Sequence, residues 1–255
     1  MILLKTKEEI ALIRDAALLL GKTLAEVGRH IHPGVTTAFL NQIGEQYIRD
    51  HGAIPLCKGY EGFPSAFCIS VNDVVVHGIP GERFIKEGDN VSLDCVISLN
   101  GYVADSAYTF GVGEVSPEVS RLMKVTKEAL YIGLDKCKAG NRVGDISHAV
   151  QMHCEKNGYS VVRELCGHGV GLKMHESPNV PNYGTPGTGP LLKEGMVIAV
   201  EPMVCMGSKN VKFSKSDGWT CSTKDGKPAA HFEHTVAITP NGPDILTTFD
   251  FIENK

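Results

Sequence analysis

The chain has 255 residues, and its 25 Lys and Arg against 29 Asp and Glu give a formal net charge of −4. Hydrophobic residues make up 42% of the chain and charged residues 21%, a globular composition that argues against disorder. The acidic balance offers no basic surface for nucleic acid, and no apolar run approaches the ~20 residues that span a membrane. The first residues lead into an amphipathic helix without a secretion signal, so we expect a cytoplasmic protein.

Four helices are predicted along the chain. Residues 6–31 begin with a capping box formed by Thr6 and Glu9, and their apolar residues recur at spacings of three and four. Glycine turns and a serine cap followed by proline mark the ends of the others. The second helix lies between Gly34 and Gly52, the third begins at Ser116-Pro117-Glu118, and the fourth covers residues 143–158.

The two helix pairs resemble a degenerate internal repeat. A shift of 106 residues maps Gly34 onto Gly140, and the order of long helix, glycine turn, short helix and strands occurs twice. No linker divides the chain. We therefore expect one catalytic domain over residues 1–255, built from two similar halves at roughly 6–110 and 116–250.

The remaining apolar runs predict strands. Residues 91–99 alternate apolar with polar side chains, and Asn100-Gly101 then turns the chain into a second strand from Tyr102, as in a hairpin with a two-residue primed turn. Residues 177–190 are rich in Pro, Gly, Asn and Thr and are expected to form a loop. Later strands are predicted at 196–200, 219–223 and 232–238. Helices packed on antiparallel strands give an α+β fold.

Eight cysteines are spread along the chain, and no two of them form a Cys-x-x-Cys pair. Neither a zinc ribbon nor a redox-active dithiol is therefore indicated. Several of the cysteines lie in apolar runs, so we expect free and mostly buried thiols.

Two aspartates of the predicted hairpin converge. If the turn has two residues, Asp105 faces Val96, and Asp94 lies diagonally across from Asp105 on the same face of the sheet. Two carboxylates directed at one point repel each other unless a cation lies between them. The alternative is a pair of solvated aspartates on an exposed face.

Two glutamates and one histidine strengthen the case for a cation. Glu201 ends the apolar run Met-Val-Ile-Ala-Val, and Glu233 precedes another strand-like run. Each could be an edge charge, but four acids buried together in strands require metal ions. Glycines on both sides of His168 allow close approach to its imidazole, which favours a nitrogen ligand over a structural histidine. Five ligands, mostly oxygen, suit a two-metal site with ions about 3.5–4 Å apart.

These motifs closely resemble those of the type I methionine aminopeptidases over essentially the whole chain. The resemblance is carried by His77 in Val-Val-His-Gly-Ile-Pro, Asp94, Asp105, His168 in Gly-His-Gly-Val-Gly, His175, Glu201 before Pro-Met, Glu233, and Gly59-Tyr60-Glu-Gly-Phe-Pro. It implies the pita-bread fold, an antiparallel sheet covered by helices with pseudo-two-fold halves. It also implies that Asp94 binds one metal, that Asp105 and Glu233 bridge both, and that His168 and Glu201 complete the second site.

The resemblance further implies a substrate site. His77 and His175 match histidines that contact the substrate near the scissile amide, and the methionine pocket is expected to be lined by Cys57, Tyr60, Phe63, Cys68 and Trp219. For the two cysteines a plain core role remains an alternative. Phe63 is often Tyr in the family and Met174 is often aromatic, so the shape of the pocket is expected to differ.

The reaction implied is removal of an N-terminal methionine when the next residue is small. Two divalent ions lower the pKa of a bridging water, Glu201 or a neighbouring carboxylate takes its proton, and His175 stabilises the oxyanion while His77 contacts the amide nitrogen. Cobalt, manganese, iron and zinc all suit such ligands. The expected partners are peptides with N-terminal methionine and nascent polypeptides, with ribosome contact as a family expectation, and we expect a monomer.

Three rival functions are weighed against this one. Prolidases and aminopeptidases P carry an extra N-terminal domain, for which the position of Asp94 leaves no room. Type II methionine aminopeptidases have an insertion between the last two glutamates, whereas Glu201 and Glu233 are only 32 residues apart. Non-catalytic binding proteins of the same fold have lost ligands, and this chain keeps all five.

Overall fold

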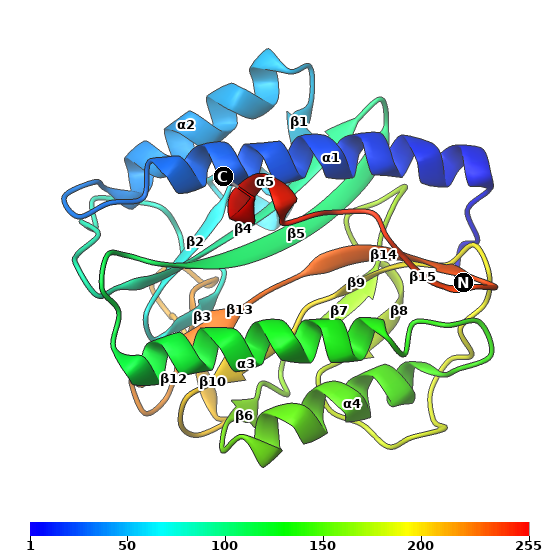
Figure 1. The fold of residues 1–255 in the computed structure, drawn as a ribbon. Helices are drawn as coiled ribbons and strands as arrows, with labels where there is room; N and C mark the ends of the chain where they lie inside the picture. Colours follow the sequence, from blue (N-terminus) through cyan, green and yellow to red (C-terminus); the bar gives the residue numbers. More distant parts are fainter. Residues whose placement is uncertain (255) are drawn as a thin grey trace.

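The computed structural model describes residues 1–254 and places two helix pairs beside antiparallel sheets (Figure 1). The helices are α1 Lys7–Arg29, α2 Thr37–Asp50, α3 Pro117–Leu134, α4 Val143–Lys156 and the short α5 Asp250–Glu253, with a 3-10 turn at Tyr60–Gly62. The predicted capping box begins α1, because Thr6 Oγ1 accepts from Glu9 N at 3.2 Å and the Glu9 carboxylate accepts from Thr6 N at 2.8 Å. No helix within residues 1–254 is both long and apolar enough to cross a membrane.

Corresponding elements recur along the chain at a fixed interval. Helices α2 and α4 each have 14 residues, and their bounds are 106 positions apart. The two-residue strands β1, Ile54–Pro55, and β6, Ser160–Val161, follow these helices at the same interval. Gly34 and Gly140 precede helices α2 and α4, and their φ angles are 93° and 95°, a left-handed conformation that glycine adopts at little cost.

The first sheet contains the predicted hairpin. Strand β4, Asn90–Leu99, pairs antiparallel with β5, Tyr102–Gly111, and Val96 lies opposite Asp105 as the sequence predicted. Asn100 and Gly101 have φ of 53° and 84°, the two positive values that a type I′ turn requires. Strand β4 also pairs with β1 and with β2, Cys68–Val71, so that β4 is the central strand of this sheet and β5 pairs along its other edge.

The second large sheet has the strand order β15-β14-β9-β7-β8. Its strands are β7 Cys166–Gly169, β8 Glu176–Pro181, β9 Val197–Val200, β14 His234–Thr239 and β15 Gly242–Ile245. The first and second sheets meet where Ala107 forms an isolated bridge with Glu233. Thr235 Oγ1 also donates to Asp105 O at 2.8 Å, so the acids of the two sheets lie close together.

Two small three-stranded sheets complete the fold, with orders β13-β10-β6 and β11-β12-β3. Their remaining strands are β3 Val74–Val76, β10 Met203–Cys205, β11 Val211–Phe213, β12 Cys221–Thr223 and β13 Ala229–His231.

Several sequence predictions need correction at strand positions. The loop expected at 177–190 begins only after β8, because Val180 is buried and pairs with Gly167. Its proline content concealed the strand, which lies at the edge of its sheet, where proline is tolerated. The predicted strand at 219–223 begins at Cys221, the one at 196–200 begins at Val197, and the one at 232–238 begins at His234 and ends at Thr239.

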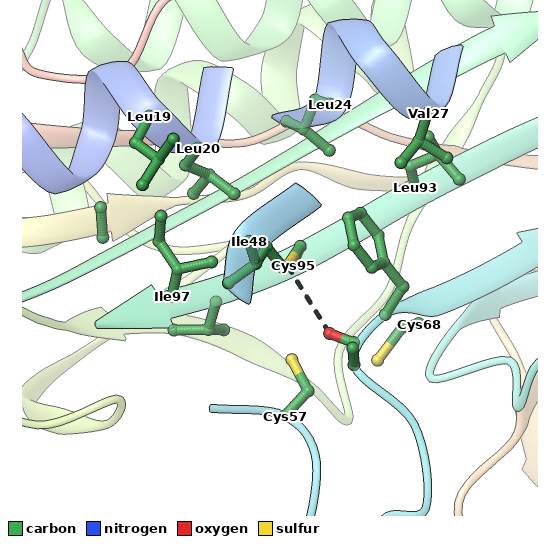
Figure 2. Close-up of a cluster of buried hydrophobic side chains, with 14 of the residues drawn as sticks. Leu19, Leu20, Leu24, Val27, Ile48, Cys57, Cys68, Leu93, Cys95 and Ile97 are labelled. Atoms are coloured by element: carbon green, nitrogen blue, oxygen red, sulfur yellow. Dashed lines mark hydrogen bonds between the residues drawn. The ribbon is translucent and has the colours of Figure 1, made fainter. Parts of the chain in front are cut away.

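The core under α1 determines which way the hairpin side chains point. Leu20 and Leu24 are fully buried and lie over Leu93 and Ile97 of β4 (Figure 2). Each such aliphatic side chain contributes roughly 1.5–3 kcal/mol when it leaves water. Because side chains alternate along a strand, Asp94 points to the opposite face of β4. The predicted free thiols are confirmed, since all eight cysteines are unpaired and seven are buried.

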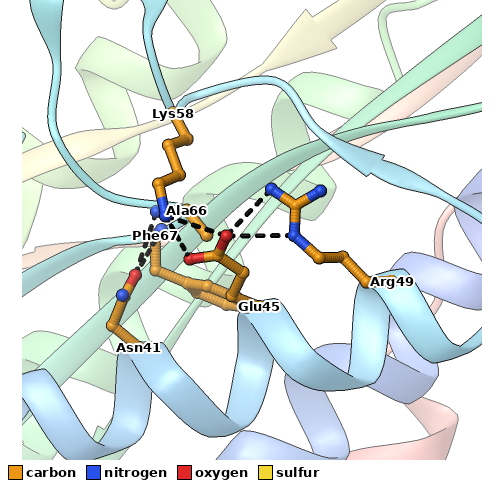
Figure 3. Close-up of polar contacts among 6 residues, drawn as sticks. All are labelled: Asn41, Glu45, Arg49, Lys58, Ala66 and Phe67. Carbon is orange, nitrogen blue, oxygen red and sulfur yellow. Dashed lines mark hydrogen bonds and ion pairs between the residues drawn. The ribbon is translucent and has the colours of Figure 1, made fainter.

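Polar contacts hold the segment before β2 against α2. Asn41 Oδ1 accepts from Ala66 N at 3.0 Å and from Phe67 N at 3.1 Å. Glu45 lies between two cations, with Arg49 Nη2 at 2.8 Å and Lys58 Nζ at 2.8 Å (Figure 3). These contacts fix both ends of residues 58–67, the segment that lies next to the cavity described below.

Candidate metal and substrate site

A cavity of about 520 Å³ lies between the two large sheets, and every site residue predicted from the sequence lines it. These residues are Cys57, Tyr60, Phe63, Cys68, His77, Asp94, Asp105, His168, His175, Glu201, Trp219 and Glu233. His168 lies within β7, and Glu201 follows directly after β9. The structure therefore brings together all the candidate residues, and their individual roles stay predictions.

The acids and His168 form the floor of this cavity. The Nε2 atom of His168 lies 3.6 Å from Asp105 Oδ2 and 3.6 Å from Glu201 Oε1, distances too long for hydrogen bonds. Ligand atoms of Asp105, His168 and Glu233 all lie within 4.8 Å of one another, and all three residues are buried. His168 Nδ1 can donate to Gly169 O at 3.0 Å, which leaves Nε2 free as a ligand atom.

These carboxylates lack charge compensation from protein groups. Buried Asp105 Oδ1 and Glu233 Oε1 have no hydrogen-bond partner. Burial raises the pKa of Asp94 to about 7, and burial together with the neighbouring acids raises the pKa values of Asp105, Glu201 and Glu233 well above their ordinary range. Unpaired buried charges cost several kcal/mol each, so a divalent cation fits this set of oxygen and imidazole donors.

Two further histidines line the cavity without joining the acid cluster. His175 Nδ1 lies 2.9 Å from the hydroxyl of Tyr60, and its ring packs edge-on against His168 with centroids 4.4 Å apart. His77 has a φ of 58°, an uncommon conformation for a residue with a side chain, and packs edge-on against Trp219. Burial lowers the pKa of His77 to about 4 and lowers that of His175, so both are neutral near pH 7.

One side of the cavity is apolar and rich in sulfur. The rings of Phe63 and Trp219 pack edge-on with centroids 5.3 Å apart. Cys68 lies opposite Asp94 in the β2–β4 pairing, and Cys57 and Cys68 approach the same region from neighbouring segments (Figure 2). Met174 also lines this cavity. An apolar, polarisable wall next to a charged floor suits a ligand with a thioether or aliphatic side chain beside a polar group.

Sequence reasoning missed His231, which lies beside Glu201. Its Nε2 atom is 3.7 Å from Glu201 Oε2, and both of its ring nitrogens are buried without a hydrogen-bond partner. Burial lowers its pKa to about 3. The signal in the sequence was the two-residue spacing from His231 to Glu233, which places both on one face of an extended segment.

The two sheets and the buried acid–histidine floor define a metallopeptidase, and the model of metallopeptidase family M24 matches residues 11–240. The chain belongs to this family. Within it, the methionine aminopeptidase of Clostridium perfringens is 52% identical over 247 residues, which cover 97% of this chain and 99% of the relative. Methionine aminopeptidase 1 of Bacillus subtilis is 51% identical over 247 residues, with the same coverage.

Solved structures agree with these sequence matches. The crystal structure of methionine aminopeptidase from Rickettsia prowazekii superposes with a TM-score of 0.96 at 41% identity and covers 97% of this chain and 100% of that one. The family and the pita-bread α+β fold predicted from the sequence are confirmed.

Proposed function

We propose that this chain is a metal-dependent hydrolase that removes the N-terminal methionine from peptides and nascent polypeptides. The observation that carries the proposal is the combination in one cavity of a buried acid–histidine floor and an apolar wall containing sulfur. Its relatives at about half identity are methionine aminopeptidases, and they match over almost their whole length.

The metal site is proposed to hold two divalent ions. Asp94, Asp105, His168, Glu201 and Glu233 are the ligands, of which Asp105 and Glu233 would bridge both ions. Support comes from the partnerless oxygen atoms of these two bridging residues and from the free Nε2 of the histidine. Cobalt, manganese, iron and zinc all accept such donors, and supply in the cell decides among them.

Divalent ions bound here would lower the pKa of water to near neutrality and polarise the scissile carbonyl. The chain's own residues supply the remaining steps. Glu201, whose pKa is raised by burial and by neighbouring acids, takes up the proton of the attacking water. His175 donates to the oxyanion: a Tyr60 hydroxyl that donates to Nδ1 leaves the imidazole proton on Nε2. His77 contacts the amide nitrogen of the scissile bond.

The apolar wall is proposed to bind the methionine side chain. Tyr60, Phe63 and Trp219 supply aromatic surface, and Cys57 and Cys68 supply polarisable sulfur next to the thioether. The residue after methionine is expected to be small, as the family resemblance implies.

We take the chain as one catalytic domain of two similar halves that acts as a monomer in the cytoplasm and meets nascent chains at the ribosome. The recurrence of α2 and α4 at an interval of 106 residues supports the two halves.

A comparison of cleavage rates for three peptides tests the function. The purified chain, loaded with manganese or cobalt, is incubated with Met-Ala-Ser, Met-Leu-Ser and Leu-Ala-Ser, and the released amino acid is measured. We expect free methionine from Met-Ala-Ser and at least tenfold slower release from the other two, since each misfits one pocket. Equal cleavage of Leu-Ala-Ser would contradict the methionine pocket.

A further inference from the structure

A buried ion pair joins the segment before α1 to the loop that carries His175. The ammonium of Lys5 donates to Glu176 Oε2, and the two side chains are only 1% and 3% exposed. Lys5 is held there by its backbone, because Lys5 N donates to Gly195 O at 2.7 Å. Lysine is rarely buried to this extent unless it is paired, so the contact with Glu176 determines where this side chain lies.

Glu176 closes the loop that contains His175. Its second oxygen, Oε1, accepts from Leu172 N at 2.8 Å and from Lys173 N at 2.9 Å. The carboxylate is thus fully engaged, with one oxygen on the backbone of the loop and the other on Lys5. His175 precedes Glu176 directly, so any shift of this carboxylate moves the imidazole that lies 2.9 Å from Tyr60.

Lys5 also packs tightly against the start of the same loop. A Cβ atom added to Gly171 would lie 2.9 Å from Lys5 Cε. The carbonyl of Gly171 accepts from Val103 N at 2.8 Å, two residues before Asp105 on β5. The loop is therefore fixed to β5 at one end and to Lys5 at the other.

From these contacts we infer that Lys5 is a positioning residue, which acts through Glu176 to hold His175 at the scissile carbonyl. The inference rests on the proposed function, because only that function gives His175 a reacting atom to meet. Lys5 itself does not line the cavity. Groups that orient a functional side chain in this way typically change activity by about 10–100-fold when they are removed.

The test is a double-mutant cycle on Met-Ala-Ser hydrolysis with metal content measured in parallel. Lys5→Met should lower kcat by about 10–100-fold, with little change in KM and unaltered metal content. In a His175→Ala background the same change should have almost no further effect, because the residue it positions is gone. Lys7→Met, at an exposed position of α1, is the matched control and should behave as the unmodified chain.

A double variant keeps the test possible if Lys5→Met, which leaves the charge of Glu176 buried and unpaired, fails to fold. Lys5→Met combined with Glu176→Gln removes both charges, keeps an oxygen for the two backbone donors, and should show the same dependence on His175. An equal loss of kcat with and without His175, or no loss at all, would overturn the positioning role. Failure of the unmodified chain to release methionine would instead overturn the proposed function, so the two failures are distinct.

Discussion

Replacing His175 by alanine removes an imidazole that lines the cavity beside His168 and contacts the hydroxyl of Tyr60. The side chain is exposed at the cavity and belongs to none of the buried apolar clusters of residues 1–254. Its loss therefore costs little beyond one partly exposed hydrogen bond, about 1 kcal/mol of folding free energy.

The catalytic cost is expected to be much larger. A donor that strengthens its bond to a developing oxyanion contributes about 2.7–4 kcal/mol, which is a factor of about 10²–10³ in kcat. His175→Ala should therefore lower kcat by this factor while KM and metal content stay nearly constant. Tyr60→Phe keeps the ring contact and removes only the hydroxyl, so its effect should be smaller, about fivefold to tenfold.

Steady-state release of methionine from Met-Ala-Ser and metal analysis on the same preparation check this prediction. His32→Ala, at an exposed position, is the matched control and should change neither quantity. Loss of metal from the His175→Ala protein would make the imidazole a ligand, and unchanged turnover would make it a surface histidine. Either result would refute the role given to it here.

Three further predictions concern metal binding and folding. Asp105→Asn should reduce activity below detection and weaken metal binding in a protein that still folds, whereas normal turnover with full metal would exclude a bridging role. The increase in Tm caused by manganese should grow from pH 5 to pH 8. Burial raises the pKa of Asp94 to about 7, so the metal-free protein loses stability as pH rises toward this value, and bound cations cancel that loss. A constant increase in Tm, measured by calorimetry, would contradict this. Gly44→Ala should lower the unfolding free energy by about 1–3 kcal/mol, since its Cβ would lie 2.3 Å from the Phe67 ring, and an unchanged Tm would refute the close packing.

The hairpin shows how far local sequence determines a site. A two-residue turn at Asn100-Gly101 fixes the register, and the register fixes which residue lies opposite Asp105. Strand alternation then places Asp94 on the face away from the core. The acid cluster was predictable because each step depended on short-range geometry and on the cost of burying carboxylates together.

Other features depended on contacts that no local pattern contains. Lys5 and Glu176 are 171 residues apart, and their pairing exists only after the two parts of the chain have packed. Residues 177–181 were predicted as part of a loop because prolines usually interrupt strands, and a place at the sheet edge permits the strand. The two-residue spacing from His231 to Glu233 indicates a shared face, but the contact of His231 with Glu201 depends on packing between segments 30 residues apart.

The central claim, that the buried acids and His168 hold the ions on which hydrolysis depends, is tested most directly by metal titration of the metal-free chain. Manganese or cobalt is added in steps while release of methionine from Met-Ala-Ser is followed. We expect no release before metal is added and a rise that is complete by two ions per chain. Steady release of methionine by the metal-free chain in excess chelator would contradict it.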